Sequence, residues 1–544
     1  MGHVFVDLPE DKPYTSVYLR DRSGKKVRQV LWGDWLTLAE SEDLEDGMTN
    51  SGRWLWVRWA WSHPDPERRL LLKIEKRFTR PDRPLEIVFV DVGIGDGAVL
   101  ITPERDTSDT AQQNGTEERV IVIDAGKSGH MRDFLDGRFK AYGKGFAFHA
   151  AIVTHPDKDH YNGFNKIVST KKITFDKLYH NGIVELSSAD TWDRLGGKSV
   201  GPDGQTEYLD TIVTTDQGMR DRFDPAIINR TNLFANMIEK GIKKANVGSF
   251  ETLGVNLGEA EDGRFWLPGF APSDARGYTI EVLGPWFEYP NATDRPQLRV
   301  FGSAIGKTKN GHSVILRLQF GHFSVLFGGD LNKPSEMFLL RQYAGISDWP
   351  STEKDRQAMI KEASKRLSSD VMKSCHHGAS DVTDEFLQAV NPAAFVISSG
   401  DQDKNYVHPR PDLLGRLGKF GKGEAPVLLS TELQRSTRDI DNSDLVRKLK
   451  KRVADLVGEA RGGTTDPTAI EEQNEELASL LGQFSKLALP SVEVDGAIYV
   501  KTDGRRLMTA FKKEATSKTS RWFYYVYSLE GDGDLRLIDR EASH

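Results

Sequence analysis

The residues best suited to chemistry stand together between Ala151 and His160. Four side chains that can bind metals follow one another within six positions: His155, Asp157, Asp159 and His160. Imidazole and carboxylate ligands together suit a borderline divalent ion such as zinc, manganese or iron. An acidic surface turn that happens to contain two histidines would show the same spacing, so spacing alone leaves both interpretations open.

The strand before this stretch must position it. Residues 146–153 form an apolar run typical of a buried strand, and Pro156 prevents that strand from continuing as a central strand. The chain therefore turns at the carboxyl end of the strand, which is where open α/β sheets bind their ligands. A helix is expected to follow, with His160 near its N-terminus.

Further candidate residues follow other predicted strands. Asp330 ends the run 323–327 and its two glycines, while His376 and His377 end the run 370–375. Adjacent residues of a strand point to opposite faces, so only one of the two histidines should face the site. The other would orient it or contact substrate. We favour His376 as the residue that faces the site.

Six motifs resemble, in the same order, those of hydrolases with the metallo-β-lactamase fold. The motif at 155–160 is similar to a variant found in the hydrolase domain of the DNA-uptake protein ComEC and its soluble relatives, with Asp157 in place of the usual second histidine. The resemblance covers roughly residues 85–433 and a tail at 496–504. The other motifs are Asp91-Val-Gly-Ile-Gly-Asp96, Ile123-Asp-Ala-Gly126, Leu326-Phe-Gly-Gly-Asp330, Cys375-His-His-Gly378 and Asn405-Tyr-Val-His-Pro409.

The resemblance implies a four-layer αββα fold, a mixed α/β class, that binds two divalent ions, zinc or manganese. His155, Asp157 and a third group would hold the first ion. The second ion would be held by Asp159, His160 and His376, with His377 beside them and Asp330 bridging the two ions.

The remaining assignments concern substrate. The position of the family's third histidine falls at or near Asn310, and His312, two residues away, could replace it or contact substrate. The loop residues Asn405, Tyr406 and His408 should overhang the cleft. The resemblance implies catalytic roles for Asp159, His408 and Tyr406, and substrate binding by Asp96, Asn310, His312 and Asn405. A plain loop histidine remains the alternative for His408.

Four segments divide the chain. Residues 1–80 hold six tryptophans and several short strand patterns, which predicts a small β-rich domain of SH3-like size. Residues 84–440 form the hydrolase domain, with an insertion at about 165–275 that could be a lid or a scaffold. Residues 441–489 predict an inserted helical hairpin. Residues 490–544 supply closing strands of the hydrolase domain.

Composition limits the partners and the compartment. The formal net charge is −7, so a nucleic-acid site would have to be a local basic patch. The single cysteine, Cys375, fits a reducing compartment. No apolar run reaches the length of about 18 residues that a membrane helix needs, so we expect a cytoplasmic protein with no membrane contact. Residues 1–80 or 441–489 could bind a protein partner or form a homo-oligomer.

Three functions remain open. The first is a metal-dependent hydrolase of phosphodiester bonds, most simply a nuclease acting on nucleic acid; the resemblance to ComEC suggests this substrate by analogy alone. The second is hydrolysis of a small phosphodiester such as a cyclic nucleotide or phosphocholine ester. The third is a binding or regulatory protein on a hydrolase scaffold. A role in bacterial defence is a hypothesis about context that no residue shows.

Overall fold

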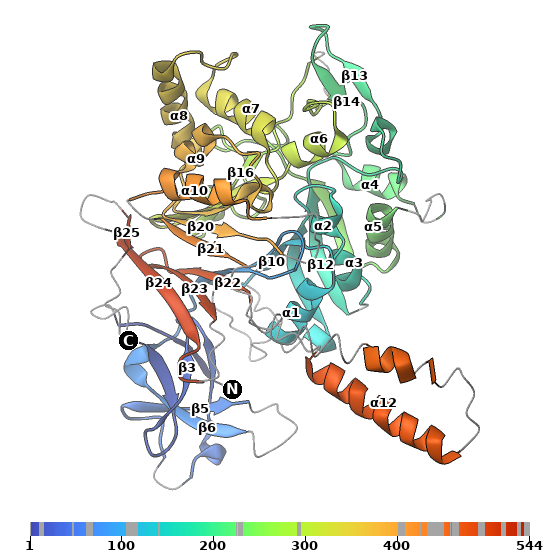
Figure 1. The fold of residues 1–544 in the computed structure, drawn as a ribbon. Coiled ribbons are helices and arrows are strands. Elements are labelled where there is room, and N and C mark those ends of the chain that lie inside the picture. Colours follow the sequence, from blue (N-terminus) through green and yellow to red (C-terminus); the bar gives the residue numbers. More distant parts are fainter. Residues whose placement is uncertain are drawn as a thin grey trace.

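The structure is a computed structural model of the chain. It describes residues 2–9, 16–45, 48–60, 69–104, 118–139, 142–170, 172–224, 226, 232–290, 295–400, 408–423, 426–431, 451–456, 458–459, 467–487, 496–512, 518–529 and 535–537. The protein is a mixed α/β structure built around two large sheets, with a separate N-terminal sheet (Figure 1).

The larger sheet has ten strands in the order β15-β12-β11-β10-β9-β8-β22-β23-β24-β25. Strands β10, β11, β12 and β15 run parallel, and the others pair antiparallel. Its central strands are buried along their whole length because both faces of the sheet are covered. The strands are β8 (Leu85–Phe89), β9 (Gly97–Ile101), β10 (Val120–Ala125), β11 (Phe146–Ile152), β12 (Ile173–His180), β15 (Val247–Thr252), β22 (Ile498–Thr502), β23 (Leu507–Lys512), β24 (Trp522–Leu529) and β25 (Leu535–Leu537).

The second large sheet has six strands in sequence order, from β16 to β21. The first three strands pair antiparallel, and β18 to β21 run parallel. The strands are β16 (Tyr278–Gly284), β17 (Ile315–Phe320), β18 (Phe323–Phe327), β19 (Val371–Lys373), β20 (Ala394–Ile397) and β21 (Val427–Ser430).

The two large sheets pack face to face, with helices on their outer sides. One apolar core joins the inner faces, including Phe89 of the ten-stranded sheet and Phe327 of the six-stranded sheet, whose rings lie 5.8 Å apart. A second core lies under α1 (His130–Arg138), α2 (Lys158–Tyr161), α3 (Phe164–Ile167) and α5 (Leu233–Lys243). A third lies under α7 (Lys333–Ala344), α8 (Glu353–Leu367), α9 (Asp384–Val390) and α10 (Pro411–Phe420). The layers therefore run helix, sheet, sheet, helix.

The N-terminal sheet has seven strands and docks on the end of the ten-stranded sheet (Figure 1). Buried Lys501 donates to the carbonyl of Trp32 at 2.7 Å and pairs with Glu86 at 3.1 Å. Arg506 donates to the carbonyl of Leu8 at 2.7 Å. The strands are β1 (His3–Val6), β2 (Val17–Arg20), β3 (Lys26–Val30), β4 (Trp35–Leu38), β5 (Trp54–Trp59), β6 (Leu70–Glu75) and β7 (Thr79–Arg80).

Part of the stretch 165–275, which the sequence presents as an insertion, belongs to the sheet. Strands β12 and β15 extend the parallel half beyond β11. The same stretch contains the helix α5, which begins at Leu233 after the N-cap Asn232. Residues 225 and 227–231 lie outside the described residues. Outside the sheet the stretch also forms β13 (Lys198–Val200), β14 (Glu207–Leu209) and α4 (Asp216–Arg222).

Two helical segments near the C-terminal end project from the body (Figure 1). Residues 451–456 and α12 (Pro467–Leu487) pack through Leu456 and Leu480. The predicted residues 441–450 and 460–466 lie outside the described residues. Within the described part of the chain, no helix combines the length and apolar character that crossing a bilayer requires.

Candidate metal centre

The carboxyl ends of strands from both large sheets meet at one edge. His155 lies three residues after β11, and the short helix α2 that follows carries Asp159 and His160. From the facing sheet, Asp330 lies three residues after β18, and His377 follows β19. The two sheets thus bring together side chains that are far apart in the sequence.

Three of these side chains have the spacing of ligands around one ion. The Nε2 atoms of His160 and His377 lie 3.3 Å apart, and each lies close to Asp330 Oδ2, at 3.2 and 3.1 Å. Asp159 Oδ2 lies 3.5 Å from His377 Nε2. Ligands at about 2.1 Å from a tetrahedral zinc ion are separated by roughly 3.4 Å. His160, His377 and Asp330 could therefore hold one divalent ion with small adjustments, and Asp159 lies beside them.

A buried carboxylate orients the ring of His160. Asp124 Oδ2 lies 2.8 Å from His160 Nδ1, so Nε2 is turned toward Asp330. The Asp124 carboxylate is itself fixed by Thr154, whose backbone N–H and hydroxyl donate to it at 2.8 and 2.7 Å. A carboxylate on the far nitrogen of a histidine is the usual support for a metal ligand.

Asp96 lies on the corresponding side of the His377 ring as an ion-pair partner. Asp96 Oδ1 lies 3.0 Å from His377 Nδ1, and the Ser398 carbonyl lies 3.2 Å from the same nitrogen. Asp96 is 5% exposed and also pairs with buried Lys373. Asp96 is close enough to His160, His377 and Asp330 to be counted with them as a ligand group. Its contact with Nδ1 instead places it behind the ring, which fits an orienting role better than the expected contact with substrate.

Both histidines of the 375–378 turn lie near the cluster. Strand β19 ends at Lys373, and His376 and His377 take left-handed backbone angles, with φ of 47° and 53°. The rule that neighbours in a strand face opposite ways therefore does not apply here. His377 is the buried member of the cluster, whereas His376 Nε2 lies 4.0 Å from Asp330 Oδ2. The geometry favours His377 where the sequence led us to favour His376.

A second group lies beside this cluster, around His155 and Asp157. His155 Nε2 lies 3.6 Å from Asp157 Oδ2 and 4.0 Å from Asp330 Oδ2. Among the described residues this buried nitrogen has no hydrogen-bond partner. Asp157 pairs with Lys309 of α6 (Ile305–Gly311). With its amide turned to match its neighbours, Asn310 also donates to Asp157 Oδ2 at 2.8 Å.

His312 faces away from both groups. Its Nε2 donates to the carbonyl of Arg299 at 2.6 Å, and its ring packs on Phe301. Burial lowers the pKa of His312 to about 4, so the side chain is a neutral part of the core. The expectation that His312 contacts a metal or a substrate does not fit this orientation.

The loop predicted to overhang the cleft is described only from His408 onward. The ring of His408 lies 6.2 Å from that of His376, at the rim of the cluster. Burial and the charges of His377 and His376 lower the pKa of His408 to about 4. Asn405 and Tyr406 lie outside the described residues.

The charges of the cluster reinforce one another. Burial alone would raise the pKa of Asp159, but the hydrogen bond from His377 and the charge of His160 outweigh it, and the pKa falls to about 2. Burial lowers the pKa of His160 and of His377, yet the charge of Asp330 raises both well above the usual value. The imidazoles therefore hold protons that a metal ion would displace.

Several residues of the centre lie outside the sequence motifs, so the sequence assigns them no role. Lys309 and Lys373 are ordinary lysines in the sequence, and their partners come from distant elements: Glu185 lies 124 positions from Lys309 and Asp96 lies 277 from Lys373. Asp124 belongs to the motif at 123–126, so its position was visible, although its contact with His160 was not.

Comparison of the chain with models of known protein families, and with curated proteins, found no match.

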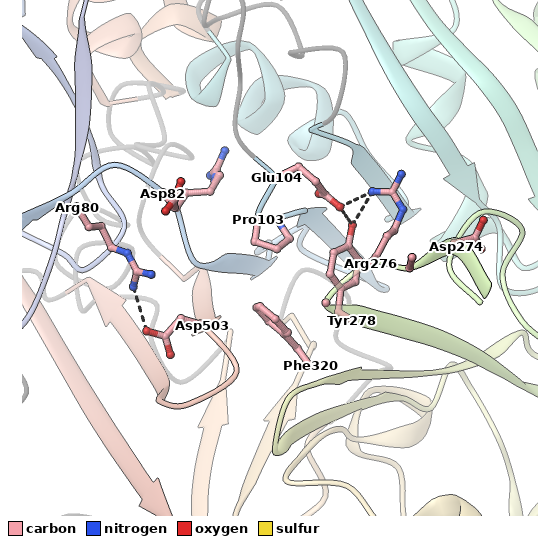
Figure 2. A pocket seen from close by; sticks show the side chains of 12 residues that line it. Arg80, Asp82, Pro103, Glu104, Asp274, Arg276, Tyr278, Phe320 and Asp503 are labelled. Atoms are coloured by element: carbon pink, nitrogen blue, oxygen red, sulfur yellow. Dashed lines mark hydrogen bonds and ion pairs between the residues drawn. The ribbon is translucent and has the colours of Figure 1, made fainter. Parts of the chain in front are cut away.

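A separate cavity of about 670 Å³ lies at the opposite end of the strands (Figure 2). Glu104, three residues beyond β9, and Tyr278, at the start of β16, line it. Its three arginines are already paired: Arg276 with Glu104, Arg80 with Asp503 at 3.0 Å, and Arg83 with Glu118 at 2.7 Å. None of the predicted site residues that the structure describes lines this cavity.

Proposed function

We propose that the chain is a metal-dependent hydrolase of phosphodiester bonds that acts on nucleic acid. The observation that carries the proposal is the cluster of His160, His377 and Asp330, with separations of 3.1–3.3 Å and a carboxylate behind each histidine. The helix–sheet–sheet–helix layering and the order of the sequence motifs support assignment to the metallo-β-lactamase fold, in its ComEC-like form.

The residues of the chain have distinct tasks in this proposal. His160, His377, Asp330 and Asp159 bind the ion, while Asp124 and Asp96 hold the two imidazoles in the ligating orientation. When bound, a divalent ion supplies a Lewis acid that polarises a phosphoryl oxygen and makes water easier to deprotonate. His408 lies at the rim of the cluster and is neutral near pH 7, because its pKa is about 4; it is placed to contact the substrate as an uncharged imidazole.

The test is hydrolysis by the purified full chain, with manganese or zinc added. The substrates are a bis-aryl phosphate and end-labelled single- and double-stranded DNA and RNA. Asp330→Asn should lose more than about 100-fold in rate, because it removes a charged ligand. Asp348→Asn, at an exposed position, is the matched control and should behave as the unaltered chain does.

Each outcome separates the candidate functions. Cleavage of a polynucleotide that Asp330→Asn abolishes supports the nuclease. Cleavage of the bis-aryl ester alone would instead support hydrolysis of a small phosphodiester. If the purified chain contains no bound metal and cleaves none of the substrates, the proposed hydrolase function is wrong. That result would favour a binding protein on the same scaffold.

A further inference from the structure

Asp157, which the resemblance assigns to a first metal ion, already contacts a buried cation. Lys309 is 5% exposed, and its ammonium contacts Asp157 and lies 2.9 Å from Glu185 Oε1. Glu185 is 1% exposed and also pairs with Arg194 at 2.7 Å. A buried ammonium between two carboxylates is a fixed positive charge beside the residues that the resemblance assigns to the first ion.

The charges on the two sides of the site are unequal. On the side of Lys309, the two carboxylates of Asp157 and Glu185 face the two cations Lys309 and Arg194, so this side is neutral without a metal. On the other side, among the described residues, one fixed cation, Lys373, and two imidazoles, whose protons a metal ion would displace, face four buried or half-buried carboxylates: Asp96, Asp124, Asp159 and Asp330. A dication is attracted to uncompensated negative charge, which favours the second side alone.

The hydrogen bonds of Asp157 lead to the same conclusion. Its Oδ1 contacts Lys309, and its Oδ2 accepts the amide of Asn310 at 2.8 Å. Both oxygens are therefore satisfied by the protein. The separations of His155 Nε2 from Asp157 and Asp330, 3.6 and 4.0 Å, are also wider than those within the cluster.

We propose that this centre binds one divalent ion, at His160, His377, Asp330 and Asp159, and that Lys309 supplies the second positive charge. This inference rests on the proposed hydrolase function and replaces the pair of ions expected from the sequence. An ammonium has three N–H groups. Asp157 and Glu185 accept from two of those of Lys309, which fixes the ammonium in place.

The test is the number of metal ions bound by the full chain, measured by elemental analysis after equilibration with excess manganese. One ion per chain is expected, with the electron paramagnetic resonance spectrum of an isolated manganese(II). Lys309→Met should bind a second ion, which doubles the stoichiometry and gives the spectrum of an exchange-coupled pair. Lys309→Arg, which keeps the charge, and Lys307→Met, on the same helix α6, should remain at one ion.

Two ions per chain in the unaltered protein would overturn the inference and leave the proposed function standing. This measurement needs no variant, so it decides the matter even if Lys309→Met does not fold. A folded Lys309→Met that still binds one ion in excess manganese would also overturn it, because Lys309 would then not be what excludes the second ion. A chain that binds no metal would remove the proposed function as well.

Discussion

Asp96 and Asp124 hold equivalent positions behind the two histidines of the cluster. Each contacts an Nδ1 atom, at 3.0 Å from His377 and 2.8 Å from His160. Asp124 belongs to β10 of the ten-stranded sheet, and Asp96 belongs to the loop between β8 and β9 of the same sheet. His160 follows a strand of this sheet, whereas His377 follows a strand of the facing sheet. The ten-stranded sheet therefore orients both histidines. Removal of the charge from one of them should weaken metal binding without removing a ligand from the cluster.

Asp96→Asn should weaken metal binding by about 10- to 100-fold, which is the usual effect of losing a carboxylate that supports a ligating histidine. Calorimetric titration of the metal-free chain with zinc would measure the change. Asp136→Asn, at an exposed position of α1, is the control. An unchanged dissociation constant for Asp96→Asn would show that the contact with His377 has no such role.

The single thiol should be inert in the native protein. Cys375 is fully buried, and burial raises the pKa of its thiol well above the usual value. A buried thiol with little thiolate reacts slowly. Alkylation by iodoacetamide should therefore be negligible until denaturant is added, with mass spectrometry as the measurement. Rapid native labelling would contradict the packing around the 375–378 turn.

The sequence predicts these residues only in part. The run 155–160 and Asp330 are visible because ligand types recur directly after apolar strands. The choice between His376 and His377 depends on the left-handed backbone angles of these two residues, which their residue types do not predict. The role of Lys309 depends on Glu185, which lies 124 positions away, so no local pattern could reveal it.

At the scale of elements, the loop between β8 and β9 supports the centre through close backbone packing. A Cβ atom at Gly95 would lie 1.8 Å from the carbonyl oxygen of Asp159, and Gly95 has φ of +102°. The loop can therefore approach α2 only with glycine at this position.

Gly95→Ala should destabilise the fold and abolish metal binding, because the loop and α2 cannot both keep their positions. Gly24→Ala is the matched control. Gly24 has a similar φ of +93°, but a Cβ there would meet nothing within 4 Å. It should cost only the backbone strain of about 1–3 kcal/mol. Denaturant unfolding and metal content would measure both effects, and equal losses in the two variants would contradict the close approach.

Glu336 of α7 places an ionisable group inside the helical layer. It is fully buried, and Oε2 accepts the backbone N–H and hydroxyl of Thr383, the N-cap of α9. Burial raises its pKa to about 8, from a usual 4.5. The folded chain therefore holds a proton that the unfolded chain releases. The contribution of Glu336 to stability is full below pH 4.5 and falls as the pH rises to about 8.

Glu336→Gln should accordingly gain stability relative to the unaltered chain as the pH rises from 5 to 8. The maximum slope is about 1.4 kcal/mol per pH unit for one fully linked proton. Urea unfolding at several pH values would measure it, with Glu259→Gln, at an exposed position, as the control. A difference between Glu336→Gln and the unaltered chain that does not change with pH would refute the proton linkage.

The elements themselves were partly predictable. The runs before His155 and Asp330 are strands β11 and β18. A short, continuous apolar run between turn residues is typical of a buried strand. Strand β12 lies inside the stretch that the sequence presents as an insertion. The hydrophobic pattern did not assign it to the sheet, because that pattern does not show which strands pair, and β12 pairs with β11.

At the scale of the whole molecule, the N-terminal sheet is held by a buried ionic contact. Lys501 is 1% exposed and pairs with Glu86, which also contacts Arg138 at 3.0 Å. The same ammonium donates to the carbonyl of Trp32 in the N-terminal sheet. This contact should couple unfolding of the N-terminal sheet to that of the sandwich.

Lys501→Met should destabilise the chain by up to about 3–5 kcal/mol, because loss of one partner leaves buried charge uncompensated. Six of the 11 tryptophans lie within the first 61 residues, so their fluorescence reports mainly on the N-terminal sheet. In the variant this signal should change at lower urea than circular dichroism does. Lys354→Met, at an exposed position, should leave the two transitions coincident, and coincidence in Lys501→Met would contradict the coupling.

The proposed ligands come from both halves of the sandwich, and this has a mechanical consequence. An ion bound by His160 and His377 would close a loop across 217 positions of the chain, and closing a long loop removes conformational freedom from the unfolded state. With one cysteine, the chain cannot form an internal disulfide to do this. The ion would be the reversible cross-link of this protein, and a chelator should lower the stability of the sandwich that the apolar core between the sheets holds together.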